Sequence, residues 1–213
     1  MSNSAILTIT GSDSTGGSGV QADITTISAL GSKAVSVITS VTLQNTLGIQ
    51  HFYDLPAPIV SGQLDAIVDD VMPETVKIGM VRNTEVLKAI VSALRRYKPK
   101  SVVYAPVLFS SHGDRLMGTA TIEMIRHKLF PLCKVIIMRR RESDLLLSDC
   151  IADNVCFLDD AADHGSVNMF ASALAVYLNQ GDSVSDAIAK AHAFATNLFS
   201  KSAKLTGRSG ELY

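Results

Sequence analysis

The chain has 213 residues, of which 47% are hydrophobic and 18% charged, and its formal net charge is −1. Its 19 lysines and arginines nearly balance 20 aspartates and glutamates, which argues against a nucleic-acid-binding domain, and no stretch approaches the ~20 apolar residues of a membrane span. Three cysteines without a C-x-x-C pair, and a start without signal-peptide features, predict a cytoplasmic protein without disulfides, folded as one domain over residues 1–213.

Strand-like and helix-like segments alternate along most of the chain. Ala5–Thr10 is predicted as a strand, Val20–Leu30 as a helix that Gly31 ends, and Ala34–Leu43, rich in valine and threonine, as a second strand. Later segments continue the pattern, with helices and strands in turn: Ile59–Val71, Thr75–Ile78, Thr84–Tyr97, Ser101–Ala105, Thr119–Lys128, Lys134–Met138 and Glu142–Ser148. This alternation predicts an α/β fold with a mostly parallel sheet and helices on both faces.

The alternation stops between Cys150 and His164, where one short apolar stretch, Val155–Leu158, precedes an acidic patch. Two further helices, Asn168–Gln180 and Val184–Lys201, are predicted to form a hairpin.

A nine-residue loop with four glycines, Gly11 to Gly19, joins the first strand to the first helix. Glycines let the backbone approach a ligand, and the start of the following helix offers unpaired N–H groups. A plain strand-to-helix connection needs only about 2–6 residues. We therefore interpret the loop as a ligand-binding element, although a long turn rich in turn-forming residues is the alternative.

The usual phosphate-loop and hydrolase motifs do not fit this loop. A P-loop needs a lysine, and none occurs before Lys33. Gly17 to Ala22 matches the dinucleotide motif in letters, but no acidic residue for the ribose lies between Asp23 and Asp54. A nucleophile elbow would need a glycine at Val20.

A carboxamide pair, Gln44 and Asn45, follows the second predicted strand. Ligands bind at the carboxyl ends of parallel strands, and a glutamine amide offers both a donor and an acceptor to the edge of an aminopyrimidine. The alternative is that the two residues only form a turn.

Several motifs together resemble one family. Gly11-Ser12-Asp13-Ser14, the run from Gly16 to Asp23, Gln44-Asn45-Thr46 and the run from Val76 to Met80 resemble hydroxymethylpyrimidine/phosphomethylpyrimidine kinases, the thiamine-pathway branch of the ribokinase-like superfamily. The resemblance implies a ribokinase-like three-layer α/β/α fold, commonly a homodimer. It also implies transfer of phosphate from ATP with Mg²⁺ to an aminopyrimidine alcohol and then to its monophosphate.

The same resemblance implies the residues of a pyrimidine pocket. Gln44 would bind the pyrimidine edge, and Gly11, Ser18, Met80 and Val107 would line the pocket around it. Ser18 stands where alanine is usual in the family.

The second half of the chain departs from the family pattern. Ala105 stands in place of an aspartate associated with metal and phosphate, and of the T-P-N-x-x-E motif only Glu142 matches, which leaves it as the candidate metal ligand. The nucleotide-side segment, at about residues 150–164, is shortened, with no counterpart of the family's lysine-glycine-glycine strand. Nearby, Arg139 to Arg141 either clamp a substrate phosphate or form a solvated cluster.

The anion hole of the family, H-G-T-G-C-T, reads His164 to Met169 here. Gly165 and Ser166 keep its beginning, but Val167 replaces the second glycine and Asn168 replaces the catalytic cysteine. Valine resists positive φ, and an amide is no base near neutral pH. Losing a general base costs about 10²–10⁴-fold in rate, so the pattern predicts very slow or absent transfer.

Two hypotheses follow for the whole chain. In the first, suggested by the intact pocket residues of the first half, it is a working pyrimidine kinase with a remodelled nucleotide side. Separately, Asp159, Asp160 or Asp163 of the acidic patch is a candidate substitute for the missing base or metal ligand. The alternative is that the acidic patch is only a solvated loop without a catalytic role. In the second, the chain is a pyrimidine-binding sensor, carrier or subunit with little phosphoryl transfer.

Overall fold

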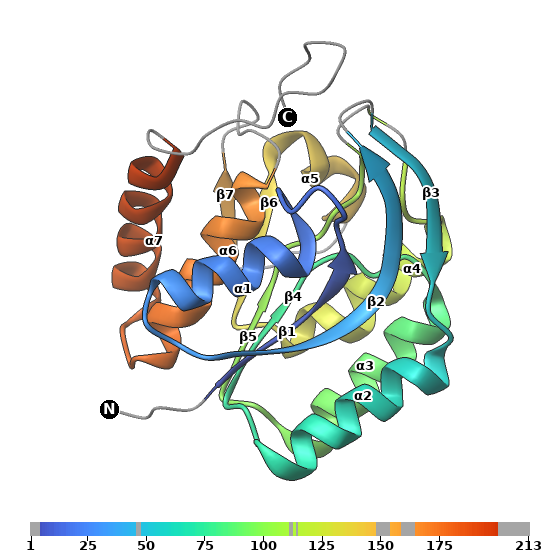
Figure 1. Ribbon diagram of the computed structural model, residues 1–213, viewed down its shortest axis with the longest axis horizontal. Helices are drawn as coiled ribbons and strands as arrows, with labels where there is room; N and C mark the ends of the chain where they lie inside the picture. The colour runs from blue at the N-terminus through green and yellow to red at the C-terminus, as the bar shows by residue number, and fades with distance from the viewer. Residues whose placement is uncertain are drawn as a thin grey trace.

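Seven strands of the described chain form a single sheet in the order β3-β2-β1-β4-β5-β6-β7 (Figure 1). The structure, a computed structural model, describes residues 5–45, 48–110, 113, 115–147, 154–158 and 165–199. Six strands pair in parallel and end at the same edge: β1 (Ile6–Ser12), β2 (Ala34–Asn45), β4 (Thr75–Ile78), β5 (Ser101–Tyr104), β6 (Val135–Arg139) and β7 (Val155–Leu158). Only β3 (Gly48–Asp54) pairs antiparallel, with β2, among these strands.

Helices cover both faces of the sheet (Figure 1). One face carries α1 (Gly19–Ala29), α6 (Ser166–Asn179) and α7 (Val184–Phe199). The other carries α2 (Ala57–Asp70), α3 (Thr84–Tyr97), α4 (Thr119–Met124) and α5 (Arg140–Leu146). Within the described ranges, no helix has the length and apolar character needed to cross a bilayer.

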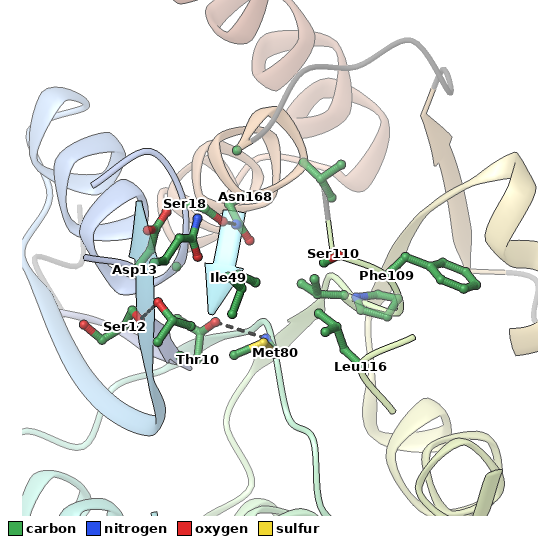
Figure 2. A pocket seen from close by; sticks show the side chains of 18 of the residues that line it. Thr10, Ser12, Asp13, Ser18, Ile49, Met80, Phe109, Ser110, Leu116 and Asn168 are labelled. Atoms are coloured by element: carbon green, nitrogen blue, oxygen red, sulfur yellow. Dashed lines mark hydrogen bonds between the residues drawn. The ribbon is translucent and has the colours of Figure 1, made fainter. Parts of the chain in front are cut away.

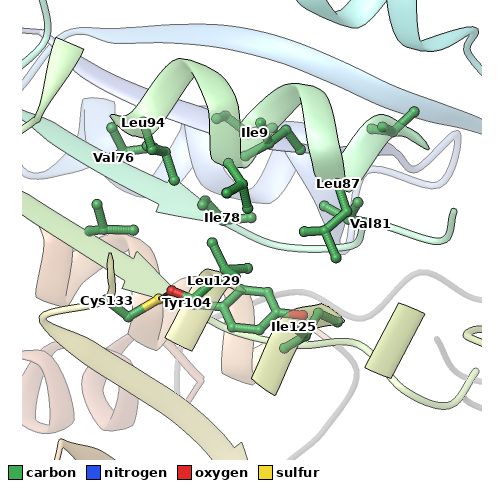
Figure 3. Close-up of a cluster of buried hydrophobic side chains, with 14 of the residues drawn as sticks. Ile9, Val76, Ile78, Val81, Leu87, Leu94, Tyr104, Ile125, Leu129 and Cys133 are labelled. Carbon is green, nitrogen blue, oxygen red and sulfur yellow. Dashed lines mark hydrogen bonds between the residues drawn. The ribbon is translucent and has the colours of Figure 1, made fainter. Parts of the chain in front are cut away.

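The strands divide their side chains between two apolar cores. Leu7 and Ile9 of β1 join the core under α2 and α3, while Ile6 joins the core under α6 and α7. Figure 3 shows the first of these cores, in which the ring of Tyr104 from β5 lies beside Ile125 and Leu129. Strands buried on both faces appear in the sequence as continuous apolar runs, which is why these segments were predictable.

The structure corrects the predicted elements at three places. β3 was not predicted. It lies at an exposed edge of the sheet, only its Gly48 is buried, and its sequence shows little alternation of apolar and polar residues. The predicted helix Thr119–Lys128 ends as α4 at Met124 and continues as a short π-helix over Ile125–Leu129.

The third correction concerns the predicted break in the alternation after Cys150. β7 continues the alternation, because Val155–Leu158 pairs in parallel with β6. The rest of the predicted shortened segment, residues 148–153 and 159–164, lies outside the described residues.

A buried ion pair connects the centre of the sheet to both helices beside the glycine-rich loop. Lys77 of β4 donates to both carboxylate oxygens of Asp23 of α1, each at 2.8 Å, and both side chains are fully buried. The third hydrogen of the ammonium group goes to Oδ1 of Asn168 in α6, at 3.0 Å. Thr8 and Ser172 also donate to Asp23. The pair therefore holds β1, β4, α1 and α6 in one arrangement.

The glycine-rich loop packs directly on the start of α6. Gly165, the N-cap of α6, has a φ of 84°, and a Cβ there would overlap the carbonyl oxygen of Gly17. Only glycine permits both that dihedral angle and that contact. The loop and the first turn of α6 therefore form one continuous surface.

We expect Lys77→Met to lower the free energy of unfolding by about 3–5 kcal/mol, because it leaves the Asp23 carboxylate buried without its counter-charge. Urea denaturation measures the effect. Lys88→Met is the matched control, since Lys88 forms an exposed pair with Glu85 and its loss costs less than about 1 kcal/mol. Adding Asp23→Leu to Lys77→Met should recover part of the lost stability. Equal losses for the two lysine variants would contradict the assignment.

We expect Gly165→Ala to destabilise the protein more than Gly16→Ala. Both positions have similar positive φ, 84° and 81°, so both variants share the left-handed strain of about 1–2 kcal/mol. A Cβ at Gly16 meets nothing within 4 Å, whereas one at Gly165 strikes the Gly17 carbonyl. The difference between their free energies of unfolding isolates the contact between loop and helix, and a zero difference would exclude it.

Candidate functional site

A cavity of about 260 Å³ lies at the carboxyl ends of the parallel strands. Residues at or just after the ends of β1, β2, β4, β5 and β6 line it, together with the glycine-rich loop and the start of α6. This is the usual position of ligand sites in open α/β sheets. Figure 2 shows the cavity with Ser18 and Asn168 on one wall and Phe109 and Leu116 on the opposite wall.

All five residues predicted to bind a pyrimidine line this one cavity: Gly11, Ser18, Gln44, Met80 and Val107. They come from four separate segments of the chain, and the fold brings them together. Their roles in binding stay predictions.

Gln44 lies on a part of β2 that extends beyond β1. The last residue of β2 that pairs with β1 is Val41, and Gln44 pairs only with Ile49 of β3. The Ser14 hydroxyl of the glycine-rich loop donates to the Gln44 carbonyl at 2.9 Å and accepts from the Gln44 N–H at 3.3 Å. The loop thus fixes the backbone from which the carboxamide reaches the cavity.

Met80 forms an apolar wall of the cavity, and its methyl group packs against Gly11. The Met80 N–H donates to Thr10 Oγ1 at 3.0 Å, and Thr39 Oγ1 donates to the Met80 carbonyl at 2.7 Å. A Cβ at Gly11 would overlap the methyl group of Met80. Any other residue at Gly11 would therefore push the methionine side chain out of place.

Asn168 is fixed at both ends of its amide. Its oxygen accepts from Lys77, and its nitrogen donates to Ser18 Oγ at 2.6 Å, 150 residues away in the sequence. The side chain is only 5% exposed, and Figure 2 shows it beside Ser18 on the cavity wall. Since its acceptor oxygen is held by Lys77, Asn168 offers no base to a ligand.

The remainder of the predicted anion hole is partly placed at the cavity. Gly165 and Val167 line it with Asn168, whereas Ser166 does not. The first N–H groups of a helix have no partner within the helix, so this end of α6 presents donors near the cavity. His164 lies outside the described residues.

The predicted metal ligand, Glu142, also lines the cavity, with Arg139 and Arg141. It is 5% exposed, and one of its oxygens accepts from the Arg139 N–H at 3.0 Å. No group of three or more acidic, histidine or cysteine side chains suited to a metal occurs among the described residues. Asp159, Asp160 and Asp163 lie outside them. The role of Glu142 stays a prediction.

Ala105, the position of the missing family aspartate, lies in the core beneath α6 and does not line the cavity. The cysteines Cys133 and Cys156 are free thiols, and burial raises the pKa of both, which disfavours the thiolate form that acts as a nucleophile.

Sequence reasoning did not single out Lys77 or Asp23. A signal was present, because Lys77 is the one charged residue of a four-residue strand that is buried along its whole length. A lysine in such a strand requires a buried acidic partner.

The relatives found by comparison with known proteins agree with one another in their names. The phosphomethylpyrimidine kinase family model matches residues 13–162. A hydroxymethylpyrimidine/phosphomethylpyrimidine kinase of Rhizobium meliloti is 42% identical over 146 residues, covering 68% of this chain and 54% of that protein. A thiamine biosynthesis bifunctional protein of Geobacter sulfurreducens is 32% identical over 236 residues, covering 90% of this chain and 48% of that protein. The chain thus spans about half the length of the curated relatives it matches.

A solved structure extends the likeness to the fold. The crystal structure of phosphomethylpyrimidine kinase from Clostridium difficile 630 superposes with a TM-score of 0.81 at 31% identity, over 91% of this chain and 99% of that one. The predicted ribokinase-like α/β fold is confirmed. With a family model matched over most of its length and a similar solved structure, the chain belongs to the phosphomethylpyrimidine kinase family.

Proposed function

We propose that this chain binds hydroxymethylpyrimidine or its monophosphate in the cavity and transfers phosphate to it from ATP at a much reduced rate. The observation that carries the proposal is the convergence of Gly11, Ser18, Gln44, Met80 and Val107 on one cavity. The names of its relatives support the substrate class and the thiamine pathway.

The lining chemistry suits an aminopyrimidine. The carboxamide of Gln44 can pair with an amino group and a ring nitrogen at once, because it carries both donors and an acceptor. Met80 and Val107 offer apolar surface to the faces of the ring. Such a pattern of apolar walls with few polar groups is typical of small-molecule sites.

ATP and Mg²⁺, implied by the kinase family, find compatible groups at the same cavity. Arg139, Arg141 and the start of α6 would hold phosphate oxygens. Glu142 would hold Mg²⁺, which takes one or two carboxylates together with substrate phosphates. Bound there, the ion would neutralise charge on the transferred group.

A second candidate function is pyrimidine binding without phosphoryl transfer, as a sensor, carrier or subunit. One observation favours it: the side chain at the family's cysteine position is an amide whose oxygen is held by the Lys77 ammonium group. Asn168 therefore cannot act as the base that the family's cysteine supplies.

The homodimer and the cytoplasmic location stay predictions. Three exposed apolar side chains on the β2–β3 ribbon, Val41, Leu43 and Tyr53, support association of two copies through this surface.

Ligand-dependent thermal stability, measured beside a phosphate-transfer assay, separates the two functions. At ~100-fold excess over Kd, a ligand adds about 2.7 kcal/mol to stability. We expect stabilisation by hydroxymethylpyrimidine, further stabilisation by ATP with Mg²⁺, and slow formation of phosphorylated product. Stabilisation by the pyrimidine alone, without product, would favour the second candidate. No response to the pyrimidine or its monophosphate would exclude both.

We expect Gln44→Ala to abolish stabilisation by the pyrimidine, because it removes the only carboxamide that lines the cavity from the β2–β3 ribbon. The matched control is Gln50→Ala, an exposed glutamine on β3 that does not line the cavity. Differential scanning fluorimetry with and without ligand measures both. Equal responses of the two variants would show that Gln44 does not contact the ligand.

A further inference from the structure

Ser18 occupies a helix N-cap but does not cap its helix. It precedes α1 with an extended backbone, φ −144° and ψ −167°, and its side chain accepts no N–H from the first turn. Serine at this position usually contributes about 1 kcal/mol through such a hydrogen bond. Here the hydroxyl group is turned toward Asn168 and lines the cavity instead.

The direction of the hydrogen bond at Ser18 is set by a buried cation. Lys77 has only donors, so the atom of Asn168 that faces it must be the amide oxygen. The amide nitrogen then faces Ser18 and donates to its Oγ at 2.6 Å. Ion pairing with Asp23 keeps the Lys77 ammonium group in place.

In this arrangement the hydroxyl proton of Ser18 points away from Asn168. A hydroxyl group has one proton and two lone pairs, and the amide of Asn168 occupies one lone pair. Among the described residues, no group accepts that proton. Since Ser18 is only half-buried and lines the cavity, the proton is available to a ligand.

We infer that Ser18 is a specificity-determining donor that binds the exocyclic oxygen of the ligand, and that Asn168 and Lys77 are positioning residues that orient it. The inference rests on the proposed function. Gln44, which would bind the edge of the ring, comes from the β2–β3 ribbon, whereas Ser18 adjoins the start of α6. In the inferred pose, the ring edge faces Gln44 and the hydroxymethyl or ester oxygen faces Ser18.

The contact serves binding rather than attack. A hydrogen bond donated to an oxygen withdraws electron density from it, which disfavours nucleophilic reaction at that atom. The chain Lys77, Asn168, Ser18 therefore selects ligands that carry an oxygen acceptor over those that carry a methyl group, and it accords with slow transfer.

The test compares hydroxymethylpyrimidine with the analogue in which a methyl group replaces the hydroxymethyl group. Isothermal titration calorimetry gives the ratio of the two dissociation constants for each variant. Ser18→Ala should lower the preference for the oxygen-bearing ligand by about 3- to 10-fold, the effect of one neutral hydrogen bond. Affinity for the methyl analogue should stay close to that of the wild type, which also shows that the variant is folded.

Asn168→Asp should lower the same preference, because a carboxylate accepts the Ser18 proton and turns it away from the ligand. Thr42→Val is the matched control. Thr42 lines the cavity, but its hydroxyl proton is already donated to the Ser12 carbonyl, so the ratio should not change.

Equal losses for both ligands in Ser18→Ala would overturn the inference, as would an unchanged ratio in Asn168→Asp. A change in Thr42→Val as large as that in Ser18→Ala would also overturn it. If neither pyrimidine binds the wild type, the proposed function itself is wrong, and the two failures are thereby distinguished.

Discussion

The ion pair between Lys77 and Asp23 is the constraint on which the site depends. Removing two charges from water costs several kcal/mol for each, so the structure tolerates them only where every hydrogen of the ammonium group has an acceptor. That requirement fixes α1 and α6 against β4. Any shift of either helix would break a buried hydrogen bond, and the cavity wall is built from the first residues of both helices.

Close contacts between backbone segments also fix the position of the glycine-rich loop at the cavity. Gly19, with a φ of 58°, lies against the carbonyl oxygen of Gly11, and Gly165 lies against that of Gly17. At each contact a side chain would separate the two segments. The glycines are therefore required by packing between the loop, its own strand and α6. Flexibility of the loop is not needed to explain them.

Much of the fold could be predicted from the sequence, because parallel strands buried on both faces form continuous apolar runs such as Val102 to Tyr104. β3 could not, because it lies at an exposed edge where packing hardly selects its residues. Gln44 could be predicted as a ligand-binding residue because it follows the segment expected as the second strand, whereas Met80 and Val107 were predicted only from the resemblance to the kinase family. The hydrogen bond between Ser18 and Asn168 was not, because it joins residues 150 positions apart through packing of α1 on α6.

The glycine-rich loop touches both halves of the cavity. Ser14 holds the backbone of Gln44 on the β2–β3 ribbon, and Gly17 with Ser18 rests on α6. A ligand group that moves one end of so short a segment also changes the free energy of the other end. Where a ligand at the ribbon and a ligand at α6 both move this segment, their binding is thermodynamically linked and the coupling is reciprocal: whatever factor one ligand imposes on the affinity of the second, the second imposes on the first.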